Sequence, residues 1–355
     1  MVEPVLRELD RRGVSYRAML AEPSATVARQ DGVEHVALTG ATPAERAAEV
    51  LAVRPGVLLL GTSVQAVVER ELSVLVRAAV PRVPTLGVLD AMLFVERRFG
   101  DGLGELPDLL AVPDEATRRR LLAAGAPGSA VIVTGNPTLE EIGTAPSPNP
   151  YCPPVRGRGE TVIRPFSPLP RTGEGLGEGA SPIDVLFVSS PVAAMRLRGA
   201  VFAIDEREAL EDMLAVLAEL RECAPAGFRV RVRLHPVQRA EPLPTPPGGI
   251  ALVPDDDPDR LASCARSDLV VGLSSTLLGE ARFLPRPAIA YLPGPFWDHE
   301  RVFAPEYGVE LARSRAELHQ MVGRALREPP APAPLAGHVG AAARIADELA
   351  RLLDR

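Results

Sequence analysis

Short apolar runs alternate with amphipathic segments along most of the chain. The runs have the form of buried parallel strands, and apolar residues recur at helical spacing between them. The predicted strands are residues 14–20, 33–38, 56–60, 85–89, 109–112, 130–134, 183–188, 228–235, 250–253, 268–273, 288–292 and 309–311. The predicted helices are residues 2–12, 42–53, 64–80, 113–124, 205–222, 257–266, 276–284, 314–327 and 339–353. Such alternation predicts an α/β fold built on parallel sheets that helices cover on both faces.

The alternation stops between residues 144 and 182, where Pro, Gly, Ser and Arg are frequent and no hydrophobic period is present. This composition predicts a disordered insertion that links two domains. We expect a Rossmann-like domain over residues 1–143, a second over 183–330 and a C-terminal helix within 338–355. A doubly wound domain normally opens with a strand and a glycine-rich turn, whereas this chain opens with a helical pattern. We therefore expect the first strand of the first domain to be missing.

The composition limits the partners that the protein can bind and indicates the compartment in which it works. The chain has 355 residues, is 46% hydrophobic and carries a net charge of −7. No long basic run is present, which argues against a nucleic-acid partner. Three cysteines without a CxxC pair argue against a disulfide framework or a zinc site and indicate a reducing compartment. Because neither a signal peptide nor a membrane span is apparent, we expect a cytoplasmic protein with at most peripheral membrane contact.

The stretch SDLVVGLSSTLLGEARFLPRPAIAYLPG, residues 267–294, is typical of a strand, a turn, a helix and a second strand. Ser274, Ser275 and Thr276 open the helix at the end of the first strand. Small hydroxyl residues there direct backbone N–H groups and the positive end of the helix dipole toward an anion, which predicts a phosphate or diphosphate site. The alternative is that Ser275 or Thr276 only caps the helix. Glu280 shares a helix face with Thr276 and is either an acceptor for sugar hydroxyls or a solvated carboxylate.

The strand FRVRVRLHP places Arg233 and His235 at its C-terminal end, toward the same crevice as the serine turn. Together they could neutralise the phosphates of a nucleotide leaving group. The alternative is a solvated arginine face with a histidine at the strand end.

Two predicted strands of the first half also end in polar residues, the first in Gly61, Thr62 and Ser63 and the second in Asp90. We place these four residues on the acceptor side of a site. Asp90 lacks a capping pattern, and a carboxylate there could act as general base toward an acceptor hydroxyl. For Ser63 the pattern favours a helix cap.

The run from Asp255 to Asp257 contains an Asp-x-Asp, which can hold a divalent metal beside a nucleotide sugar. Asp257 precedes Pro258, however, and this pair is typical of a helix cap. We therefore expect no metal ligands in this loop.

The sequence VIVTGNPTLEE, the strand end Arg233-Leu234-His235-Pro236 and the stretch over residues 267–294 together resemble GT-B-fold enzymes. In particular they resemble CDP-glycerol glycerophosphotransferase-like proteins, surface-polysaccharide glycosyltransferases and relatives of non-hydrolysing UDP-N-acetylglucosamine 2-epimerases. The resemblance implies two Rossmann-like domains facing a cleft that closes about a hinge near 135–137. It also implies that no metal or other cofactor is needed.

By this resemblance the second domain would bind a UDP- or CDP-linked donor, and the first a saccharide or lipid-linked acceptor. The residues assigned to the donor, with Arg233 added for its charge, are Arg233, His235, Ser274, Ser275, Thr276 and Glu280.

Three hypotheses follow for the function. The first is a glycosyltransferase-like enzyme in which Asp90 and His235 are catalytic and a sugar or glycerophosphate reaches a cell-surface polysaccharide or lipid. The second is a sugar-nucleotide 2-epimerase, which would need acidic and basic groups around one sugar; the first half shows no convincing acidic pair. The third is a truncated paralogue that binds sugar nucleotides without turnover.

Overall fold

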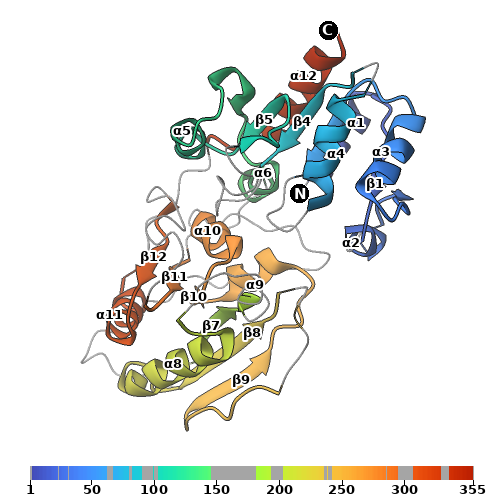
Figure 1. The fold of residues 1–355 in the computed structure, drawn as a ribbon. Helices are drawn as coiled ribbons and strands as arrows, with labels where there is room; N and C mark the ends of the chain where they lie inside the picture. Colours follow the sequence, from blue (N-terminus) through green and yellow to red (C-terminus); the bar gives the residue numbers. More distant parts are fainter. Residues whose placement is uncertain are drawn as a thin grey trace. The chain divides into compact units, whose positions relative to one another are not determined.

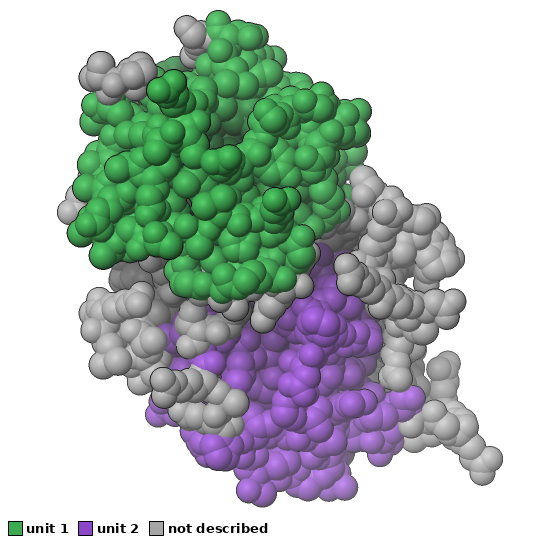
Figure 2. Space-filling model, turned by 90° about the vertical axis from the view of Figure 1, so that its right-hand side faces the viewer, with its two compact units in different colours: residues 1–140, 335–355 green, residues 141–334 purple. Residues whose placement is uncertain are grey.

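The chain forms two compact units, which Figure 2 shows in green and purple. Unit 1 consists of Met1–Glu140 and Leu335–Arg355, and unit 2 of Glu141–Pro334. The computed structural model describes residues 2–22, 24–30, 32–61, 67–79, 82–89, 99, 103–144, 181–192, 203–235, 238, 242–284, 286–294, 307–328 and 336–354.

Unit 1 is built on parallel strands. A four-stranded sheet has the order β3-β4-β5-β6, and β1 pairs with β2 in a separate two-stranded sheet. The strands are β1 (Met19–Leu20), β2 (Val36–Ala37), β3 (Leu58–Gly61), β4 (Thr85–Val88), β5 (Leu109–Val112) and β6 (Val131–Val133). The helices are α1 (Glu3–Arg11), α2 (Ser24–Gln30), α3 (Pro43–Ala52), α4 (Val67–Arg77), α5 (Glu115–Ala123), α6 (Pro137–Thr144, which runs into unit 2) and α12 (Ala341–Leu353).

Successive side chains of a strand point to opposite faces of the sheet. In the four-stranded sheet, helices cover both faces. On one face Val88 and Ala111 pack with α1 and α12, and Figure 1 shows these helices beside the sheet. On the other face Leu110 and Val112 pack with Leu121 of α5. Unit 1 therefore draws part of its core from the last helix of the chain.

Unit 2 holds one six-stranded parallel sheet with the order β12-β11-β10-β7-β8-β9. Its strands are β7 (Ile183–Val188), β8 (Phe228–Arg233), β9 (Ile250–Pro254), β10 (Leu269–Gly272), β11 (Ala288–Tyr291) and β12 (Glu310–Ala312). Its helices are α8 (Glu206–Glu219), α9 (Arg260–Arg266), α10 (Thr276–Phe283) and α11 (Arg315–Ala325). The chain first builds outward from β7 to β9 and then returns to place β10 on the other side of β7. This is the strand order of a Rossmann domain, and it confirms the predicted α/β fold with Rossmann-like parallel sheets.

The centre of this sheet is apolar on both faces, as a parallel sheet between helices requires. All four residues of β10 and of β11 are buried. Gly272 is needed where β10 runs against β7, since a Cβ atom there would lie 2.5 Å from the carbonyl oxygen of Val188. The two central strands can therefore approach at the end where their loops begin.

Local predictions differ from the structure in several places. The helix predicted from a cap at Asp257 instead begins at Arg260, and Asp259 is its cap, accepting from the N–H groups of Leu261 and Ala262. The strands predicted over 14–20 and 33–38 shrink to the two residue pairs of β1 and β2. Helices α2 and α6 were not predicted, although Pro137 at the first helical position and the Asn136 side chain, which accepts from Thr138 N, are helix-start signals.

Candidate functional site

The candidate site is the C-terminal edge of β7 and β10 in unit 2. These neighbours are the point where the strand order reverses. In an open α/β sheet the loops at such a point diverge and leave a crevice in which ligands bind. The loop after β7 begins with Ser189 and Ser190, and the loop after β10 contains Ser274 and Ser275.

The serine turn after β10 lies where the sequence placed it. Ser274 donates its backbone N–H to Ser190 Oγ at 3.3 Å, so the two loops are joined. The Ser275 hydroxyl accepts from Leu277 N at 3.3 Å, which makes Ser275 the N-cap of α10. The first turn of α10 has no acidic residue, and residues 274–276 are half-exposed. No carboxylate of its own first turn thus compensates the positive end of the α10 dipole, and the turn is within reach of solvent.

The start of α8 has the opposite electrostatic character. Asp205 caps it by accepting from the N–H groups of Arg207 and Glu208. Glu206 and Glu208 add two carboxylates to its first turn. A helix N-terminus can hold a diphosphate, but three carboxylates repel an anion at this one. The charge distribution therefore favours α10 as the anion site.

His235 lies at the same edge of the sheet. It follows β8, which pairs in parallel with β7, and Val188 is the register partner of Arg233. The imidazole is half-buried, and this burial holds its pKa below the ordinary value for histidine. A neutral imidazole that gains a proton when an anion arrives suits the neutralisation of a leaving group.

Sequence reasoning missed Ser189, Ser190, Gln238 and Glu206 at this edge. The Gln238 side chain accepts from His235 N and donates to Ser189 Oγ, Ser190 O and Glu206 Oε1. The Ser-Ser pair after the first strand of a Rossmann unit is a signal that could have been read. Gln238 carries no such signal, because its partners come from three separate segments.

Arg233 is engaged with carboxylate and backbone oxygens. Its guanidinium lies 2.7 Å from Asp255 Oδ2 and donates to Asp257 O at 2.8 Å. The alternative of a solvated arginine face is wrong for Arg231 and Arg233, although Arg229 is exposed. Arg231 is only 6% exposed and bonds Asp184 at 2.8 Å and Asp255 at 2.7 Å. Arg231 and Arg233 thus enter a network of charges in which a buried charge needs a partner.

Glu280 is only 6% exposed, so the alternative of a solvated carboxylate is wrong. Arg260 of α9 holds both of its oxygens, with Nε 2.9 Å from Oε2 and Nη2 3.2 Å from Oε1. A carboxylate has lone pairs beyond those two bonds, so an acceptor role toward sugar hydroxyls stays a prediction.

The acceptor-side residues are only partly described. Gly61 is the last residue of β3 and is half-buried. Thr62, Ser63 and Asp90 lie outside the described residues. The roles predicted for these four residues stay predictions.

The aspartate loop 255–257 serves the arginine network. Asp255 accepts from Arg231, Arg233 and the hydroxyl of Ser263. Burial acts to raise the pKa of Asp257. A hydrogen bond from Asp259 N and the ion pair with Arg266 at 2.5 Å outweigh this effect and hold the pKa below the usual range. Within the ranges given above, no group of three or more His, Cys, Asp or Glu side chains is arranged to hold a metal ion.

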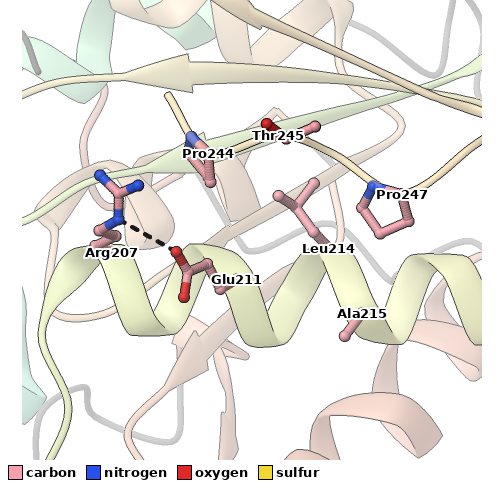
Figure 3. A pocket seen from close by; sticks show the side chains of 7 residues that line it. All are labelled: Arg207, Glu211, Leu214, Ala215, Pro244, Thr245 and Pro247. Carbon is pink, nitrogen blue, oxygen red and sulfur yellow. Dashed lines mark hydrogen bonds and ion pairs between the residues drawn. The ribbon is translucent and has the colours of Figure 1, made fainter. Parts of the chain in front are cut away.

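A hollow of about 290 Å³ lies elsewhere on unit 2, between α8 and the segment before β9. Figure 3 shows its lining, with the Arg207–Glu211 ion pair (3.2 Å) at one end and Pro244 and Pro247 facing the helix. None of its residues belongs to the predicted site, and we assign no ligand to it.

Comparison with known proteins gives likeness of structure alone. No protein-family model matches the chain, and no curated protein matches it in sequence. Among solved structures, the UDP-GlcNAc 2-epimerase of Methanocaldococcus jannaschii in complex with UDP-GlcNAc and UDP has a TM-score of 0.61 at 14% identity, over 99% of this chain and 96% of that one. The UDP-GlcNAc 2-epimerase of Neisseria meningitidis bound to UDP-GlcNAc has a TM-score of 0.59 at 14% identity, over 99% and 96%.

A third structure, the glycotransferase of kitacinnamycin, has a TM-score of 0.57 at 16% identity, over 99% of this chain and 95% of that one. Such likeness extends over the whole length of both chains at very low identity, and it confirms the predicted GT-B fold. For the described part of the chain, no helix combines the length and the apolar character needed to cross a bilayer.

Proposed function

We propose that unit 2 binds the nucleoside diphosphate end of a UDP- or CDP-linked donor at the edge formed by β7, β8 and β10. One observation carries the proposal. The hydroxyl-bearing start of α10, free of acidic residues, lies on the same edge as His235, whereas the start of α8 is acidic. The structures of similar fold that hold UDP or UDP-GlcNAc support this choice of ligand.

The reaction we propose is transfer of the donor's sugar, or of its glycerophosphate, to a polysaccharide or lipid acceptor. For glycerophosphate, the acceptor oxygen would bond to its phosphorus while the P–O bond to the nucleoside monophosphate breaks, and that monophosphate leaves. For a sugar, the acceptor oxygen bonds to the anomeric carbon while the bond from that carbon to the phosphate oxygen breaks. The electron pair of the broken bond stays on the diphosphate, which His235 and the turn of Ser274, Ser275 and Thr276 would stabilise. The acceptor proton would pass to Asp90, and Gly61, Thr62 and Ser63 would lie on the acceptor side, as the sequence predicts.

A second candidate is 2-epimerisation of the bound sugar nucleotide. The observation that favours it is the likeness to the two solved 2-epimerases. Product analysis separates the candidates, because an epimerase converts a sugar nucleotide without any acceptor, whereas a transferase needs one.

Binding is the first test of the proposal. We expect UDP- or CDP-linked donors to raise the melting temperature and to give a saturable isotherm. Ser275→Ala should weaken binding by about tenfold or more, the value of a hydrogen bond to a charged group. The matched control is Ser314→Ala, which removes the Ser cap of α11 in the same unit and should leave binding unchanged.

His235→Asn should also weaken binding, whereas His319→Asn, on the half-exposed face of α11, should not. If the wild-type protein bound none of the UDP-, CDP-, GDP- or CMP-linked donors, the proposed function would be wrong. If it bound a donor without converting it, alone or with acceptors, a binding protein without turnover would be the better description.

A further inference from the structure

Gln238 joins three segments that the chain keeps apart. Its backbone N–H donates to His235 O at 2.8 Å, and its side-chain Oε1 accepts from His235 N at 2.8 Å. Its Nε2 lies 3.0 Å from Ser189 Oγ, 3.3 Å from Ser190 O and 3.0 Å from Glu206 Oε1. One amide thus connects the ends of β7 and β8 with the start of α8.

The orientation of this amide is fixed by its partners. The backbone N–H of His235 can only donate, and the carbonyl oxygen of Ser190 can only accept. An ionised Glu206 also only accepts. Rotating the amide by half a turn would set the Gln238 oxygen against two acceptors and its nitrogen against a donor, so only the observed orientation satisfies all three.

The network continues to the serine turn. Ser190 receives Gln238 Nε2 on its carbonyl oxygen and the N–H of Ser274 on its hydroxyl. Ser189 and Ser190 are only 4% and 2% exposed, so their polar atoms need partners inside the protein. Gln238 therefore acts on the α10 turn through Ser190, and on His235 directly.

We propose that Gln238 and Glu206 are positioning residues, whose hydrogen bond holds the ends of β7 and β8 so that His235 and Ser274 meet the donor diphosphate together. This inference rests on the proposed function. Its physical basis is preorganisation: loops already held in the binding arrangement lose less conformational freedom when the ligand arrives. The inference also assigns a role to the acidic start of α8, because Glu206 accepts a hydrogen bond from Gln238 there.

The test is an exchange of the two side chains. Gln238→Glu keeps the acceptor for His235 N but replaces the donor with a carboxylate oxygen that faces Glu206 and Ser190 O. Glu206→Gln retains an oxygen that accepts from Gln238. In the double variant the amide and the carboxylate have changed places. The amide introduced at position 206 can then donate to the carboxylate introduced at position 238, while Ser190 O still lacks its donor.

We expect Gln238→Glu to weaken UDP binding about tenfold or more, and Glu206→Gln to weaken it less than about threefold. The double variant should recover part of the loss from Gln238→Glu, because the contact between positions 206 and 238 returns while Ser190 O stays without its donor. Gln320→Glu, on the exposed face of α11, adds the same charge without these contacts and is the control. Recovery in the double variant would show that the two side chains act through each other. The melting temperature of each variant without nucleotide separates a loss of binding from a loss of folding.

Two results would overturn the inference: UDP binding by Gln238→Glu that equals that of the control, or a double variant that binds no better than Gln238→Glu. A wild-type protein that binds no nucleotide would instead overturn the proposed function and, with it, the role of Gln238 in a donor site. In that case, amide hydrogen exchange tests whether Gln238 holds the two strand ends. Gln238→Leu should speed exchange in peptides that contain residues 186–192 and 230–235, and unchanged exchange would contradict that role.

Discussion

At the scale of single residues, His338 shows how burial fixes a protonation state. The side chain is only 4% exposed, and its Nδ1 accepts from the backbone N–H of Asn136 at 3.0 Å. Desolvation holds its pKa below the ordinary value, with Arg344 acting in the same direction and Asp114 against it. The neutral ring with its proton on Nε2 is therefore the form that fits.

This arrangement predicts a pH dependence of stability. The unfolded chain takes up a proton at His338 more readily than the folded one, so the free energy of unfolding should fall as the pH drops from 7 through the ordinary histidine pKa of about 6.5. His338→Asn retains an acceptor near the position of Nδ1 and does not titrate. We expect a flatter dependence of its melting temperature on pH between 7 and 5; parallel curves for the two proteins would contradict the assignment.

Single residues also show how far prediction from the sequence can reach. The turn of Ser274 to Thr276 and the strand-end His235 could be predicted, because they follow apolar runs whose ends meet at one edge of a parallel sheet. The partners of Arg231 could not be predicted. Asp184 and Asp255 are far from it in sequence, and only the pairing of β7, β8 and β9 brings their carboxylates to the guanidinium.

At the scale of elements, the start of α12 is capped by a distant residue. Its N-cap is Gly340, which has no side chain and adopts a left-handed conformation with φ 76°. Glu140 of α6 supplies the missing acceptors, taking the N–H of Gly340 at 2.8 Å and that of Ala342 at 3.0 Å. A carboxylate at a helix N-terminus both satisfies unpaired N–H groups and faces the positive end of the dipole.

We predict that Glu140→Ala lowers the free energy of unfolding of unit 1 by about 1–2 kcal/mol, the usual effect of losing a charged cap. Glu140→Gln should cost less, since it keeps an acceptor oxygen. Glu115→Ala, which removes a mostly exposed carboxylate from the first turn of α5, is the control and should cost about 0.5 kcal/mol or less. Denaturant unfolding measures all three, and equal losses at 140 and 115 would refute the cap.

Elements with long apolar runs could be predicted almost to the residue, as β5 and β7 show. Strands β1 and β2 could not, because they pair over only two residues each and lie outside the main sheet. The choice between Asp257 and Asp259 as helix cap was likewise decided by contacts in the folded protein, because the Asp257 carboxylate forms an ion pair with Arg266.

At the scale of the whole molecule, unit 1 is discontinuous in sequence. The chain leaves it after Glu140, builds unit 2 and returns for α12. The helix buries Ile345, Ala346, Leu349 and Leu352 in the same cluster as Val5, Leu86 and Val88. The first unit therefore cannot complete its core until the last residues of the chain are in place.

We predict that deleting residues 338–355 destabilises unit 1 and leaves nucleotide binding by unit 2 intact. Ile345→Ala is the milder variant and should cost about 2–5 kcal/mol, because this side chain is fully buried. Limited proteolysis with mass spectrometry should show earlier cleavage within residues 1–140 in both variants, with UDP binding unchanged. Equal cleavage rates in the two units would contradict this division.

The sequence by itself determined the order and type of the main elements, the parallel sheets and the hydroxyl-bearing turn at a strand end. These follow from local patterns, since hydrophobic period and capping residues act over a few positions of the chain. Tertiary structure alone decided which strands became neighbours. With them it decided the ion pairs of Arg231, the ion pair between Arg260 and Glu280, and the hydrogen-bond partners of Gln238. Those contacts join residues far apart along the chain, and only folding brings such residues within hydrogen-bond distance.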